Sequence, residues 1–120
     1  MDSFVIDELL TTGCNICNCI LGDNILSIEL DKALRAETFE QIHDLMIVIF
    51  GWSSILISEF GNERDHWVVL TEFKPLTSID VVKVTSNRLT LEGRGPDGKG
   101  WLKYEITGCK YKIISRQQPD

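Results

Sequence analysis

The chain has 120 residues, of which 43% are hydrophobic and 25% are charged. This length and composition fit a single folded domain over residues 1–120 and exclude a disordered or fibrous chain. The net charge of −6 disfavours direct binding of nucleic acid, because phosphate recognition requires a concentrated basic surface.

Residues 3–11 predict a short helix, with a strand as the open alternative, and not a targeting segment. Phe4, Val5 and Leu9 lie near helical spacing over residues 3–11, with acidic residues between them. A secretory signal would need a basic flank, and the longest apolar run of the chain, Leu45–Phe50, is too short to span a bilayer. We therefore expect a cytoplasmic protein that does not enter a membrane.

Two short strands are expected next. Residues 15–21 and 25–30 alternate apolar and polar side chains, and the Gly22-Asp23-Asn24 sequence between them is typical of a tight turn. The pattern predicts a β-hairpin.

Residues 38–50 predict a second and longer helix. Thr38 and Gln41 match the capping-box pattern at a helix start, and Gly51 supplies a stop signal. Apolar residues recur at intervals of three to four positions, as on one face of a helix, at Phe39, Ile42, Leu45 or Met46, and Ile49.

The second half of the chain is rich in β-branched and aromatic residues, which favour strands. Expected strands cover residues 54–60, 67–73, 80–84, 88–92, 101–106 and 110–114, and the last four read as an antiparallel meander over residues 80–114. The predicted fold class is α+β, with an antiparallel sheet or barrel-like meander of about six to eight strands packed by two helices.

Three of the four cysteines fall within the stretch TGCNICNCI. Cys14 and Cys17 have the spacing of half a zinc site, but only Cys109, His43 and His66 remain elsewhere to complete one. On a regular strand Cys17 and Cys19 would share one face, and free cysteine usually packs as a small buried hydrophobe. We favour buried cysteines with no bound metal or other cofactor, and a zinc-stabilised module stays open as an alternative.

Two further function classes are considered. An enzyme could use His66 with Asp65 or Glu63 as an acid–base group, but these residues lie in a polar loop that offers little burial, so no catalytic residue is assigned. A small ligand-binding β-rich domain would require an apolar cavity.

Acidic residues are concentrated in the first half of the chain. Residues 1–66 hold twelve acidic and three basic side chains, a net charge of −9, whereas residues 67–120 hold six acidic and nine basic side chains, a net charge of +3. This asymmetry favours a negative face for a basic protein partner, and an ordinary solvated surface is an equal alternative.

The acid-rich first half, together with the segments LTLEGRG from Leu89 and WLKYEI from Trp101, resembles bacterial immunity proteins of toxin–immunity pairs, in particular those of contact-dependent growth inhibition systems. This resemblance implies an inhibitor rather than an enzyme, with a cognate toxin domain, commonly a basic nuclease, as its partner. Its carboxylates would mimic substrate phosphates and occlude the toxin's active site.

The partner-binding residues expected on this interpretation lie on the predicted helix and around the loop that follows strand 54–60. A helix through residue 37 would align its acidic residues on one side. The predicted set is Glu37, Glu40, Asp44, Glu59, Glu63 and Asp65.

Overall fold

The described part of the protein consists of β-strands and contains no α-helix. A computed structural model describes residues 9–10, 14–35, 41–60, 66–96 and 100–115. Its strands are β1 (Leu9–Leu10), β2 (Cys14–Leu21), β3 (Ile25–Arg35), β4 (Gln41–Phe50), β5 (Ser54–Phe60), β6 (Trp67–Val69), β7 (Ser78–Ile79), β8 (Val81–Val84), β9 (Arg88–Arg94), β10 (Trp101–Thr107) and β11 (Lys110–Ser115).

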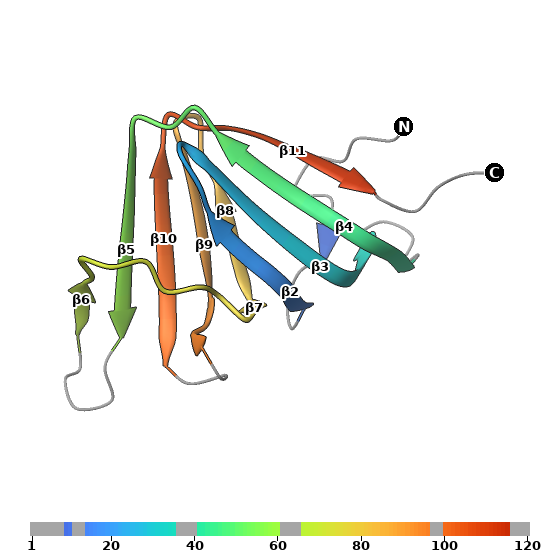
Figure 1. Ribbon diagram of the computed structural model, residues 1–120, viewed down its shortest axis with the longest axis horizontal. Helices are drawn as coiled ribbons and strands as arrows, with labels where there is room; N and C mark the ends of the chain where they lie inside the picture. The colour runs from blue at the N-terminus through green and yellow to red at the C-terminus, as the bar shows by residue number, and fades with distance from the viewer. Residues whose placement is uncertain (1–8, 11–13, 36–40, 61–65, 97–99, 116–120) are drawn as a thin grey trace.

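These strands form two antiparallel sheets (Figure 1). The first sheet has the order β11-β4-β3-β2-β7, with β1 paired to β3, and the second has the order β6-β5-β10-β9-β8. The hairpin predicted for residues 15–30 is confirmed as β2 and β3, which pair from Leu21↔Leu26 to Ile16↔Leu30.

Two long strands pass from one sheet into the other at glycine corners. β4 continues into β5 past Gly51, and β10 continues into β11 past Gly108, and both glycines have positive φ angles, of 68° and 71°. Because β4 pairs with β11 while β5 pairs with β10, the two strands form one bent ribbon. Figure 1 shows the sheets diverging from these corners.

A non-strand segment over residues 70–77 runs from the outer edge of the second sheet toward β2 (Figure 1). The hydroxyl of buried Tyr104 donates a hydrogen bond to the carbonyl of Lys74, and the Lys74 ammonium contacts both carboxylate oxygens of Glu59 at 3.1 Å. The Thr77 carbonyl then accepts a hydrogen bond from the amide of Ile16 in the first sheet. The segment therefore links the two sheets.

The inner faces of the two sheets share one hydrophobic core. Over residues 25–31 of β3 and 44–50 of β4 every second residue is buried, as expected for strands with one covered face. The fully buried side chains include Leu26, Ile28, Leu30, Leu45, Ile47 and Ile49 from the first sheet and Leu89, Leu91, Leu102, Tyr104 and Ile106 from the second.

The predicted α+β class is wrong, since the described residues form two packed antiparallel sheets and include no helix. The error is clearest at residues 41–50, where the predicted helix is strand β4. Its apolar run satisfies helical spacing and two-residue alternation at once, and pairing with β3 on one side and β11 on the other decides in favour of the strand.

The structure differs from three other predictions of helices and strands. Of the helix expected at residues 3–11, only Leu9–Leu10 lies within the described residues, and it is strand β1. The strand expected at 67–73 ends at Val69. The meander is confirmed for β8, β9 and β10, but β11 pairs with β4 in the first sheet instead of with β10.

No helix long and apolar enough to cross a membrane occurs in the described ranges.

Candidate functional site

Three carboxylates lie together on the outer face of the first sheet, and we call them the acidic cluster: Glu29 and Asp31 of β3, and Asp44 of β4. Leu30 and Leu45, which alternate with them along the two strands, are directly paired and point into the core. The carboxylates therefore point outward, where Asp31 and Asp44 are exposed and Glu29 is half-buried.

Asp31 and Asp44 face each other across the strands. The pairs Leu30↔Leu45 and Lys32↔His43 flank them on either side, so the antiparallel register places the two acidic residues opposite one another. Asp44 also has a φ of 56°, in the left-handed region that few residues other than glycine, asparagine and aspartate adopt. Like charges placed directly opposite destabilise a sheet, so this arrangement costs stability.

The neighbouring strand β2 completes the surroundings of the cluster. The Asn18 amide donates a hydrogen bond of 3.2 Å to a Glu29 carboxylate oxygen. A β-bulge between Ile16 and Asn18 turns Cys17 outward. Desolvation, and then the negative charges of Asp31, Glu29 and Asp44, raise the pKa of the Cys17 thiol. Cys17 therefore stays protonated at neutral pH.

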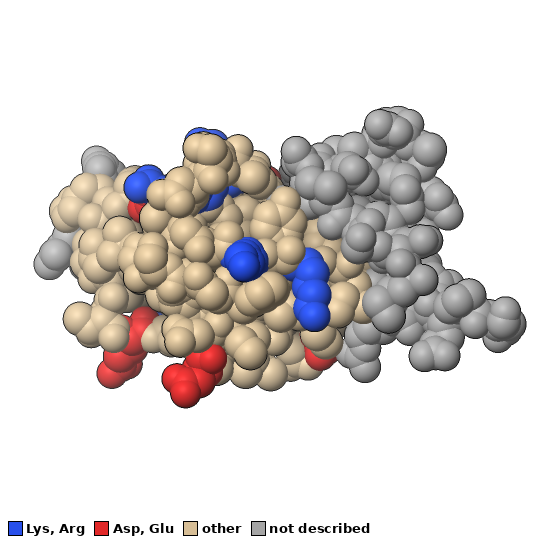
Figure 2. All heavy atoms as spheres, turned by 90° about the horizontal axis from the view of Figure 1, so that it is seen from above, with Lys and Arg blue, Asp and Glu red and all other residues tan. Residues whose placement is uncertain are grey.

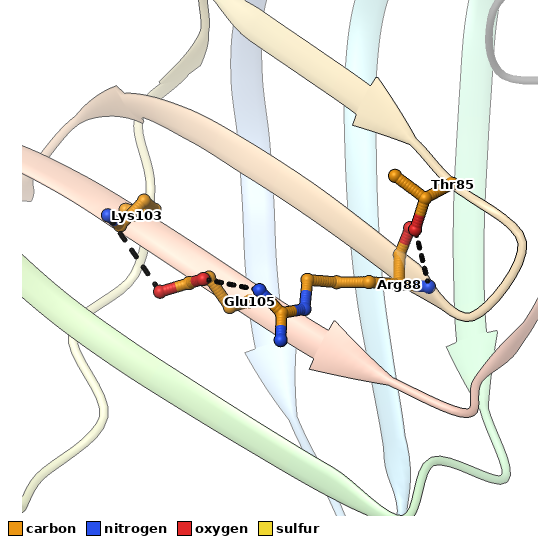
Figure 3. A network of polar contacts seen from close by, with 4 residues as sticks. All are labelled: Thr85, Arg88, Lys103 and Glu105. Carbon is orange, nitrogen blue, oxygen red and sulfur yellow. Dashed lines mark hydrogen bonds and ion pairs between the residues drawn. The ribbon is translucent and has the colours of Figure 1, made fainter.

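Charges on the outer face of the second sheet are instead paired with one another (Figure 3). Glu105 lies between two cations, at 3.2 Å from the Arg88 guanidinium and 3.8 Å from the Lys103 ammonium. The same ammonium stands 4.3 Å from the centre of the Trp67 ring. This network holds one carboxylate between two cations, so its charges are partly compensated within the sheet.

The predicted partner-binding residues do not gather at one place within the described part of the chain. Asp44 lies in the acidic cluster, whereas Glu59 lies on β5 of the second sheet in an ion pair with Lys74. Glu37, Glu40, Glu63 and Asp65 lie outside the described residues. The helix that was expected to align Glu37, Glu40 and Asp44 is wrong, because Asp44 belongs to a strand.

Sequence analysis did not identify Glu29 and Asp31 as site residues. The alternation of β3, in which Leu26, Ile28 and Leu30 point inward, was a usable signal that both carboxylates face outward. Their proximity to Asp44 could not be found in the same way, because it arises only when β4 is a strand paired with β3.

The cysteines do not share one face as predicted. Cys17 is exposed, whereas Cys19 is half-buried, with its sulfur 3.8 Å from the Tyr104 hydroxyl. The bulge at Cys17 shifts the alternation by one residue and so separates the two side chains. Within the described ranges, no group of three or more histidine, cysteine, aspartate or glutamate residues is placed to hold a metal ion.

Charged side chains are also segregated over larger distances. In Figure 2, basic side chains lie over the middle and upper part of the face seen from above, whereas acidic side chains project mainly along its lower border.

Comparison of the chain with protein-family models, curated proteins and solved structures finds no match.

Proposed function

We propose that this protein is an immunity protein that binds and neutralises a basic toxin domain, of the nuclease type, through the outer face of the first sheet. The observation that carries the proposal is the opposition of Asp31 and Asp44 beside Glu29. A basic partner would relieve the repulsion between these carboxylates, so an arrangement that is unfavourable in the isolated chain becomes favourable in a complex.

Inhibition on this proposal is stoichiometric. The carboxylates attract cationic side chains that would otherwise hold the phosphates of the toxin's substrate, and the sheet face then covers the active site. Residues of β3 and β4 suit this role because both strands are paired on both sides within the sheet, which fixes the positions of the carboxylates before binding.

A protection assay tests the proposal. A candidate basic nuclease toxin domain is induced in cells that also express the wild-type chain, the triple variant Glu29→Gln/Asp31→Asn/Asp44→Asn, or the control Asp23→Asn. Asp23 is an exposed acidic residue in the β2–β3 turn, before the start of β3 and outside the acidic cluster.

The wild type and the Asp23→Asn control are expected to protect growth, and the triple variant is expected to lose protection while it accumulates to the same level. Full protection by the triple variant would rule out the acidic cluster as the binding surface. Absence of protection by the wild type would rule out immunity against that toxin.

A further inference from the structure

The outer face of the first sheet carries charge of both signs, at separate places. The acidic cluster lies around the middle of β3 and toward the start of β4. Exposed Lys110 and Lys112 lie on the edge strand β11, where they pair with Phe50 and Val48 near the other end of β4. We call these two residues the lysine strip.

Apolar side chains lie beside the lysine strip, at the end of the first sheet next to the β2–β3 turn. Ile20 is 59% exposed and Ile25 is 47% exposed. Val48 and Phe50 lie beside them, because Ile25 pairs with Phe50 while Ser27 pairs with both Ile20 and Val48. We call Ile20, Ile25, Val48 and Phe50 the apolar patch. Side chains of this kind gain stability when a second surface removes them from water.

We infer that this face binds a second copy of the same chain, in a two-fold symmetric dimer. A two-fold interface requires a surface that is complementary to itself, and a face with an acidic cluster in one region and lysine and apolar side chains together in another meets this requirement.

The spacing of the strands indicates how the copies meet. Sheets pack face to face either nearly aligned or at about 90°. In the crossed arrangement, the two-fold axis lies between the two sheets and runs diagonally to their strands. With strands about 4.8 Å apart and a rise of about 3.4 Å per residue, this axis brings Asp31 of each copy near Lys112 of the other copy. The same axis brings Ile25 of each copy near Ile20 of the other copy. The dimer thus pairs opposite charges around a buried apolar patch.

This dimer covers the acidic cluster, so a second copy and a basic toxin domain would compete for the same face. The dimer would be the form of the chain without toxin, and binding of toxin would convert it into a heterodimer. The dimer itself is tested with the isolated chain, so its failure would leave the proposed function standing.

Sedimentation velocity of purified chains tests the inference through a charge exchange. One variant, Asp31→Lys/Asp44→Asn, removes the negative region of the face, and Lys110→Glu/Lys112→Glu removes the positive region. Asparagine is chosen at position 44 because it tolerates the left-handed backbone there. The wild type is expected to sediment as a dimer at micromolar concentration.

Each charge variant alone is expected to weaken the dimer at least about 10-fold, and an equimolar mixture of the two is expected to restore a dimer. A second pair of variants does not depend on charge: Ile20→Ser/Ile25→Ser should dissociate the dimer, whereas Leu56→Ser/Val69→Ser on the second sheet should not. All four of these side chains are at least 43% exposed, so their replacement should leave the fold intact.

A monomeric wild type would overturn the inference. A mixture of the two charge variants that stays monomeric would overturn it as well, because both variants would then carry complementary faces without associating. Equal dissociation by the Leu56→Ser/Val69→Ser control would place the interface elsewhere.

Discussion

At Asp44 the structure differs strongly from the sequence prediction, because the residue was expected on a helix and lies in strand β4. Asp44 is an acidic residue in an apolar strand, it lies opposite Asp31 in the sheet register, and its φ of 56° is unusual for a residue other than glycine. Local rules of this kind are broken mainly where function requires it. Asp44 is therefore the residue at which stability and binding should respond in opposite directions.

We predict that Asp44→Asn stabilises the isolated chain by about 0.2–1 kcal/mol, because it removes the cross-strand repulsion and keeps a side chain suited to the left-handed backbone. Chemical denaturation measures this change, and Asp23→Asn serves as the control that should leave the free energy of unfolding unaltered. A less stable Asp44→Asn variant would show that the Asp31 and Asp44 carboxylates do not repel each other in the folded protein.

The pKa of the Cys17 thiol depends on the charges of the acidic cluster, so it can be used to test whether these carboxylates lie nearby. Desolvation and the nearby negative charges raise this pKa above its ordinary value, so alkylation of the exposed thiol should be slow at neutral pH and should accelerate only at alkaline pH. The double variant Asp31→Asn/Asp44→Asn should lower the apparent pKa and accelerate alkylation at neutral pH. Peptide-level mass spectrometry measures the rate at Cys17 alone, and an unchanged pH profile would place the carboxylates away from the thiol.

At the scale of elements, a strand can be predicted from sequence when its own residues and the adjacent turns specify it. The β2–β3 hairpin and strands β5, β9 and β10 were predicted because alternation and turn residues specify them directly. The segment of residues 41–50 was wrong because its apolar run fits two periodicities, and the partners that decide between them, β3 and β11, come from distant parts of the chain.

The candidate site was less predictable than the fold for the same reason. Glu29 and Asp31 could have been placed on the polar face of a strand from alternation alone. Their meeting with Asp44 depends on the β3–β4 register, and the outward position of Cys17 depends on a bulge that the sequence does not mark. Contacts across strands therefore define the site, and they require the sheet order.

The close approach of β7 to β9 depends on Gly93. A Cβ atom at this position would lie 1.9 Å from the Ser78 carbonyl oxygen and 2.8 Å from its carbon, both backbone atoms that cannot rotate away. We predict that Gly93→Ala destabilises the protein by about 3 kcal/mol or more, as measured by thermal or chemical denaturation.

Gly22→Ala is the matched control for this prediction. The nearest atom to its added Cβ would be the Ile25 carbonyl oxygen at 3.7 Å, an ordinary contact, so its stability should change by no more than about 0.5 kcal/mol. Equal stability of the Gly93→Ala and Gly22→Ala variants would contradict the close packing of β7 on β9.

At the scale of the whole molecule, the two sheets differ in how they handle charge. In the second sheet Glu105 pairs with Arg88 and Lys103, whereas in the first sheet the like charges of the acidic cluster lie together. The first sheet is therefore the face on which a partner of opposite charge gains most. A basic toxin domain and a second copy of the chain would both use this face.

The most direct test of the acidic cluster is the affinity of the purified toxin domain for the chain, measured by titration calorimetry at low and high salt. The wild type and Asp23→Asn should bind equally and lose affinity with salt, because opposite charges on the two partners are screened. The triple variant Glu29→Gln/Asp31→Asn/Asp44→Asn should bind at least about 30-fold more weakly, with a reduced dependence on salt. Affinity of the triple variant equal to that of Asp23→Asn at both salt concentrations would contradict the role of the acidic cluster.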